Sequence, residues 1–193
     1  METALTGFAM SVDACDPETR RHGERLARYA TRFGAHIGLP RADLDVLVRG
    51  ALLHDVGKVA IPEGVLFKPG PLTDDEFQVV KTHAVVGETL CRLVPSLDLL
   101  GPIVRHHHER LDGTGYPDGL HGDQIPLLAQ IVGLVDIFDA LTSTRPYRTA
   151  LPAERAWEEL TREARMGHRR RDLVEAFIDL SSRGEFAEVK ASA

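Results

Sequence analysis

The sequence predicts an all-α fold, arranged as a single compact domain of several helices. Apolar residues recur at three- and four-residue steps in successive segments. Stretches that contain Pro and Gly separate these segments, and no alternating pattern of useful length indicates a strand. At 193 residues and 43% hydrophobic content, the chain is long enough to bury one core.

The chain divides into three parts. Residues 1–12 show no sustained period, so we expect a flexible N-terminal segment there. The folded domain is expected over 13–183, followed by a C-terminal tail at 184–193. Asp16 can cap a first helix that begins at Pro17 and stops before Gly38 and Pro40.

Local signals place the next helices. A second helix is expected over about 43–54, and a loop rich in Pro follows at 62–71. Thr73 and Glu76 form a capping-box pattern, which starts a helix carrying Phe77, Val80 and His83 on one stripe. Another helix is expected from about Leu97 to the histidines at 106–108.

The second half of the chain begins with an irregular segment. Residues 110–124 contain four glycines and a proline, which favours a loop. A helix is expected from near Pro126, and two more cover about 152–165 and 171–181.

Charge and composition exclude several classes of function. The formal net charge is −6, and a sequence-independent grip on a nucleic-acid polymer needs a basic face. No apolar run approaches the roughly 18 residues of a membrane span. The N-terminus has no signal-peptide pattern, so we expect a cytoplasmic protein without a membrane partner. Cys15 and Cys91 have no metal-like spacing and are expected to be free thiols.

Two motifs carry the chemistry. The first, HHHERLDGTGYPDG at 106–119, leads from histidines and a carboxylate into a glycine-rich loop with an aromatic tip. The second, HDVGK at 54–58, offers an imidazole at His54, a carboxylate at Asp55 and an ammonium at Lys58 that can meet phosphate. Metal ligands beside a loop that faces substrate suggest hydrolysis.

Helical phasing sorts the histidines. At about 100° per residue, His107 shares an inward stripe with Ile103 and Val104, His108 lies at its edge, and His106 falls outside it. Glu18 and His22 are four residues apart, so both face the core side of the first helix. A salt bridge or a helix-end interaction is the alternative role for Glu18.

These motifs resemble the HD-GYP family of metal-dependent cyclic-dinucleotide phosphodiesterases over residues 16–150. The run DGTGYP at 112–117 matches the loop of that family, and VDIFDALTSTRPYR at 135–148 matches its next signature. The resemblance implies an HD-type helical domain. It also implies a set of metal ligands: Glu18, His22, His54, Asp55, His83, His107, His108 and Asp136.

Some positions depart from the pattern. Phasing places Asp139 nearer the inward stripe than Asp136, so Asp139 is expected to support a ligand while the family pattern makes Asp136 the ligand itself. Gln130 stands where the family usually has arginine, which affects local packing. The run of Arg169, Arg170 and Arg171 is expected to be a solvated face.

The resemblance implies hydrolysis of cyclic di-GMP to pGpG and on to GMP. Two or three divalent ions, with Asp55 as bridge, would activate water, and a ligand set of oxygen and imidazole without thiolate favours iron or manganese. Lys58 and Arg145 would stabilise the phosphate charge, and Tyr116 would lie against the nucleotide. Another HD-type nucleotide phosphohydrolase and a catalytically silent cyclic-dinucleotide sensor or interaction module are the alternatives. A homodimer or a signalling-protein partner stays open.

Overall fold

The structure is a computed structural model. It describes the backbone of residues 17–144 and 149–186, and the side chains of those ranges from residue 21 onward. The α-helices in this part of the chain are α2 (Pro17–His36), α3 (Arg41–Leu53), α4 (Glu63–Leu66), α5 (Asp74–Arg92), α6 (Gly101–His106), α7 (Leu127–Thr142), α8 (Ala153–Arg165) and α9 (Arg171–Ser182).

Three 3₁₀ segments connect some of them: η1 (Val56–Ala60), η2 (Pro95–Leu100) and η3 (Gly122–Gln124). No strand forms within these ranges, although an isolated antiparallel bridge joins Asp112 to His121. The predicted all-α fold is therefore confirmed. No helix in the described part of the chain is both long enough and apolar enough to span a bilayer.

Helix boundaries follow the expected signals, with two exceptions: the loop expected over 62–71 contains the short helix α4, and the helix expected from Leu97 is divided. The side chain of Thr73 accepts from the Glu76 backbone, and the Glu76 side chain accepts from the Thr73 backbone, so the capping box that starts α5 is present. The helix expected from Leu97 instead divides into η2 and α6. Pro102 lies in the first turn of α6 and has no N–H to continue an α-helical ladder from η2.

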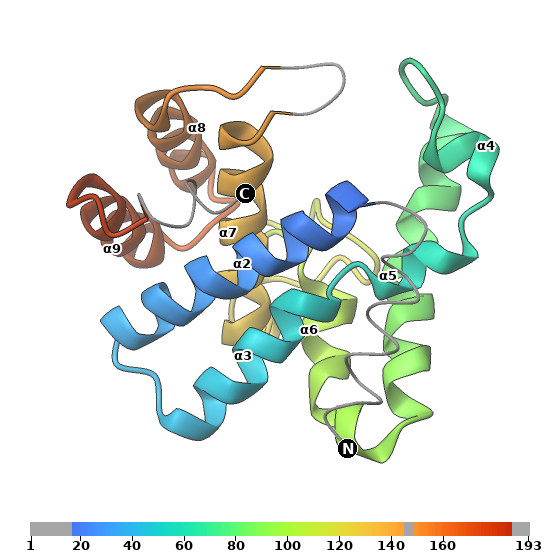
Figure 1. Ribbon diagram of the computed structural model, residues 1–193, viewed down its shortest axis with the longest axis horizontal. Coiled ribbons are helices and arrows are strands. Elements are labelled where there is room, and N and C mark those ends of the chain that lie inside the picture. The colour runs from blue at the N-terminus through green and yellow to red at the C-terminus, as the bar shows by residue number, and fades with distance from the viewer. Residues whose placement is uncertain (1–16, 145–148, 187–193) are drawn as a thin grey trace.

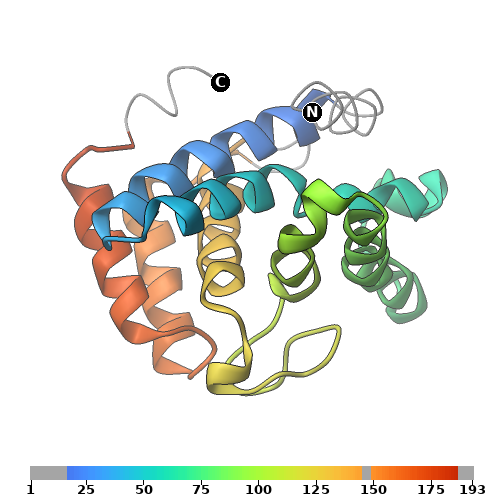
Figure 2. The ribbon, with the colours of Figure 1, turned by 90° about the horizontal axis from the view of Figure 1, so that it is seen from below.

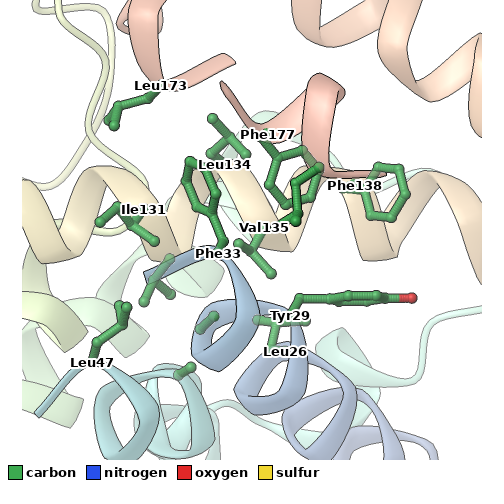
Figure 3. Close-up of a cluster of buried hydrophobic side chains, with 14 of the residues drawn as sticks. Leu26, Tyr29, Phe33, Leu47, Ile131, Leu134, Val135, Phe138, Leu173 and Phe177 are labelled. Carbon is green, nitrogen blue, oxygen red and sulfur yellow. The ribbon is translucent and has the colours of Figure 1, made fainter. Parts of the chain in front are cut away.

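The main core lies around α7. Phe33 of α2, Phe138 of α7 and Phe177 of α9 are fully buried and meet edge to face, with the Phe177 centroid 5.2 Å from Phe33 and 5.0 Å from Phe138 (Figure 3). In Figure 2, α8 and α9 flank α7 on one side, whereas α5 lies beyond it on the other. Helices α2 and α3 run across the top of this arrangement in Figure 2 and cross in front of α7 in Figure 1.

Two glycines permit the close approaches that bring these elements together. A Cβ at Gly57 of η1 would lie 1.9 Å from the carbonyl oxygen of His83, so η1 rests directly on α5. A Cβ at Gly133 of α7 would lie 2.2 Å from the carbonyl oxygen of His107. Larger residues at either position would push apart the helices whose histidines converge.

Candidate metal centre

Three buried histidines share one backbone arrangement. In each, Nδ1 lies within hydrogen-bond distance of the carbonyl three residues earlier: His54 to Ala51 (2.8 Å), His83 to Val80 (2.7 Å) and His107 to Val104 (2.8 Å). Because a carbonyl only accepts, Nδ1 must carry the hydrogen, and Nε2 carries the lone pair in the neutral ring. Among the residues that the structure describes, none provides a hydrogen-bond partner for these three Nε2 atoms.

The histidines and two carboxylates form two adjacent clusters. The first cluster consists of Asp55, His83, His107 and His108, and the second consists of His22, His54 and Asp136. Within each cluster, one potential ligand atom from every residue lies within 4.8 Å of the others. Seven of the eight residues that the sequence suggested as metal ligands are thus brought together. The eighth, Glu18, lies outside the residues whose side chains are described.

Asp55 lies between the two clusters. Its Oδ1 is 3.4 Å from Nε2 of His83 in the first cluster, and its Oδ2 is 3.2 Å from Nε2 of His54 in the second. Nζ of Lys58 lies 2.5 Å from the same Oδ2. His54 and Asp55 lie between the end of α3 and the start of η1, and Lys58 lies within η1, so this short stretch of chain places all three side chains close together.

His22 reaches the second cluster from α2. Its Nε2 lies 3.2 Å from Oδ1 of Asp136, and its Nδ1 lies 2.7 Å from Oδ2 of Asp139. Burial alone would lower the pKa of His22, but the hydrogen bonds to Asp136 and Asp139 outweigh it and raise the pKa to about 9. Asp139 is fully buried, whereas the Asp136 side chain is 20% exposed.

Burial sets the protonation of the first cluster. It lowers the pKa of His83, lowers that of His108 to about 3, and lowers that of His107 well below its usual range. Burial would raise the pKa of Asp55, but the neighbouring His54 and Lys58 charges hold it well below its usual range. At neutral pH the rings of His83, His107 and His108 are therefore neutral and Asp55 is ionised. This is the protonation state that metal ligation requires.

These residues fit divalent metal ions. Asp55 Oδ1 and the Nε2 atoms of His54, His83 and His107 are buried and have no hydrogen-bond partner within 21–144 and 149–186, which is costly unless a bound ion satisfies them. Carboxylate oxygens and neutral imidazoles are good ligands for divalent transition metals. Two adjacent groups of such atoms offer two neighbouring sites.

The glycine-rich loop stands against the first cluster. The ring of Tyr116 stacks on His108, with centroids 4.7 Å apart and an interplanar angle of 30°. Burial, together with the charges of Asp55 and Asp136, raises the pKa of Tyr116, so its phenol stays neutral. Of the other residues suggested to face substrate, Lys58 lies beside Asp55, and Arg145 lies outside the described residues.

Glu109 fixes this loop, a role that the sequence motifs did not predict. Its buried carboxylate accepts backbone N–H groups from the far side of the loop, those of Asp118 (2.7 Å), Gly119 (3.1 Å) and Leu120 (3.1 Å). Arg105 adds two bonds to the Asp118 carboxylate. Glu109 directly precedes a glycine-rich loop, whose backbone N–H groups have no helical partners. This position is the sequence signal that could have indicated the role.

One expectation about the arginine run is wrong. Arg169 is only 9% exposed, and its guanidinium donates to the carbonyl of Glu109 and lies near the carboxylate of Glu163. Arg171 does lie on the surface, where it pairs with Glu175. Arg169 is buried because the turn between α8 and α9 packs against the start of the loop.

The chain is similar to several known proteins. The profile of the HD domain family matches residues 8–171. A 3'3'-cGAMP-specific phosphodiesterase 3 of Vibrio cholerae is 41% identical over 156 residues, which cover 81% of this chain and 34% of that protein. A cyclic di-GMP phosphodiesterase of Thermotoga maritima is 39% identical over 168 residues, covering 86% of this chain and 45% of that protein. The chain thus spans less than half the length of these two relatives.

A solved structure shares the fold. Bd1817, described as an HDG"Y"P protein from Bdellovibrio bacteriovorus, superposes with a TM-score of 0.70 at 21% sequence identity. The match covers 85% of this chain and 52% of that one. At this identity the likeness establishes the architecture alone, and it is the helical domain that the sequence predicted.

Proposed function

Because the chain belongs to the HD domain family, we propose that it is a metal-dependent phosphodiesterase that hydrolyses cyclic di-GMP. Membership confirms the resemblance drawn from the sequence motifs. The observation that carries the proposal is the set of buried Nε2 atoms grouped around Asp55, for which the described part of the chain offers no hydrogen-bond partner. Relatives named as phosphodiesterases of cyclic di-GMP and 3'3'-cGAMP support the substrate class.

In this proposal, the two clusters hold two divalent ions. His83, His107 and His108 would hold one, His22, His54 and Asp136 the other, and Asp55 would contribute to both. Divalent ions at such a centre make water acidic enough to supply a nucleophile near neutral pH and offset phosphate charge. Iron or manganese suits the sulfur-free ligand set, and elemental analysis of the purified protein tests that identity.

The chain's own residues would orient the substrate. Lys58, whose ammonium already lies at the centre, would donate to a nonbridging phosphate oxygen as negative charge grows there. Tyr116, held against His108, would present its ring to a nucleotide and exclude water from one side of the centre. Arg145 is proposed to add a second cation at the phosphate.

A third ion is proposed beside the second cluster. It would involve Glu18, which lies one helical turn before His22 on α2, and it would help the enzyme accept the linear dinucleotide left by the first cut. The wild type is then expected to carry the reaction through to GMP. Glu18→Ala is expected to lose one ion and accumulate pGpG, whereas two ions in the wild type would contradict this role for Glu18.

Product chromatography tests the proposed function. Metal-loaded protein is incubated with cyclic di-GMP, 3'3'-cGAMP and cyclic di-AMP, and pGpG and GMP are expected from the first. Binding of cyclic di-GMP without any product would contradict the proposal and favour a silent sensor. We further propose that the protein acts in the cytoplasm, where its nucleotide substrate would be met.

A further inference from the structure

Helix α5 places an aromatic ring and an ammonium group next to Tyr116. The Phe77 and Tyr116 rings are 6.2 Å apart between centroids and nearly perpendicular, at 81°. Nζ of Lys81 lies 4.9 Å from the Phe77 centroid and 5.5 Å from that of Tyr116. Phe77 and Lys81 are four residues apart, so α5 presents both on one side.

The group formed by Phe77, Lys81 and Tyr116 is accessible, and no carboxylate among the described residues pairs with its ammonium. Phe77 is 42% exposed, although it is a large apolar residue. In the part of the chain that the structure describes, Lys81 has no ion-pair partner, and its ammonium faces the two rings. A cation over ring faces keeps hydrogen-bond donors available for a ligand.

The group is continuous with the metal centre. Tyr116 stacks on His108, and its centroid lies 6.4 Å from that of His83, which also belongs to α5. If the phosphate of a ligand lies at the first cluster and the rest of the ligand extends along Tyr116, that remaining part contacts Phe77 and Lys81. A cyclic dinucleotide has this extended form, with a base on either side of its phosphates.

We propose that Phe77, Lys81 and Tyr116 form a purine subsite that favours guanine over adenine. This inference rests on the proposed function, because it assumes a nucleotide at the metal centre. Phe77 supplies a stacking face, and stacking on a ring is tolerant of base identity. Lys81 supplies the selectivity, since both purines offer the acceptor N7, but guanine adds the acceptor O6 at the position where adenine carries an N6 donor.

Binding measurements on variants test the subsite. Isothermal titration is performed on metal-loaded protein with slowly cleaved phosphorothioate analogues of cyclic di-GMP and cyclic di-AMP. Phe77→Ala is expected to weaken both analogues by about tenfold or more, because any base stacks. Lys81→Met is expected to weaken the guanine analogue about tenfold and the adenine analogue clearly less, because adenine offers the ammonium N7 but not O6. Lys81→Arg is expected to keep the preference for guanine.

Two matched controls accompany these variants. Val79→Ala removes an exposed apolar side chain from another face of α5, and Arg171→Met removes one positive charge on α9, far from α5 (Figure 1). Both are expected to bind like the wild type. Metal content and melting temperature of every variant establish that the centre and the fold are intact.

The outcomes separate this inference from the proposed function. If Phe77→Ala binds both analogues as tightly as Val79→Ala does, the subsite is overturned even while wild-type turnover continues. Equal weakening of both analogues by Lys81→Met would overturn the selectivity, because it would mean that the ammonium meets phosphate. If the expected binding changes appear in a protein that never cleaves cyclic di-GMP, the subsite stands and the proposed function fails.

Discussion

Nδ1 of His22 lies 2.7 Å from Oδ2 of Asp139, and this contact fixes the imidazole so that Nε2 faces Asp136. Asp139 is itself held by Arg25, whose Nε and Nη2 donate to its two oxygens at 2.7 Å and 3.0 Å. The second cluster therefore depends on a residue that does not belong to it. A carboxylate behind a ligating histidine sets the orientation and basicity of the ring.

Asp139→Asn is therefore expected to weaken metal binding in the second cluster by about 10- to 100-fold. The amide can still contact His22, but it lacks the charge that makes the ring a good ligand. Metal titration of the variant measures this affinity, and the first cluster serves as the internal control. Unchanged affinity at both sites would show that Asp139 serves only the packing of Arg25.

Metal binding at His22 is expected to release a proton. With a pKa of about 9, the ring is protonated at pH 7 in the metal-free protein, and ligation requires a neutral ring. Lowering the pH below 9 therefore makes the proton a stronger competitor, and affinity falls by up to about tenfold per pH unit. Calorimetry in buffers of different ionisation enthalpy counts the proton. No release at pH 7 would contradict the assignment of His22 as a ligand.

Lys58→Ala is expected to keep its metals and lose turnover of cyclic di-GMP by about ten- to a hundredfold. The ammonium is assigned to phosphate charge rather than to a metal. Lys68→Ala is the matched control, because Lys68 also pairs with a carboxylate and is 32% exposed, against 31% for Lys58. Equal kcat values for the two variants at saturating metal would place the phosphate elsewhere.

Glu109→Gln is expected to lower stability by about 1.5–3 kcal/mol, because a buried carboxylate that accepts three backbone N–H groups is replaced by an amide. The loosened loop should also raise KM through Tyr116 while metal content is kept. Urea unfolding and steady-state kinetics measure the two effects.

Glu175→Gln serves as the control for Glu109→Gln, because Glu175 pairs with Arg171 at the surface, where such a change costs little. A Glu109 variant that unfolds like this control would show that the loop is held by other contacts.

Local signals were sufficient for most helix boundaries. Pro17, Thr73 and Pro126 lie at or next to the starts of α2, α5 and α7, because capping and the missing N–H of proline act within one turn. Helical phasing also anticipated the full burial of His107 and of Asp139. Such properties depend on residues a few positions apart.

Local sequence signals did not predict contacts between segments that are distant in the sequence. Phe77 was placed on the same stripe as His83, yet it is 42% exposed, because α5 extends past the core to the edge of the metal centre. Arg169 was taken for a surface charge, whereas Glu109 and Glu163 enclose it. The grouping of Asp136 with His22 and His54 was predicted from the family motif. Helical periodicity could not predict it, because the three residues come from three separate segments of the chain.

Turnover of cyclic di-GMP as a function of the metal bound per chain tests whether the two clusters form the catalytic metal centre. The protein is stripped of metal, iron or manganese is added in steps, and bound metal and product are measured in each sample, with Asp55→Asn in parallel. We expect no product without metal, product that rises as the two clusters fill, and neither full metal content nor turnover in Asp55→Asn. Full turnover by the metal-free protein would contradict a metal-dependent reaction. Full metal content and wild-type turnover in Asp55→Asn would contradict the role of Asp55 in both clusters.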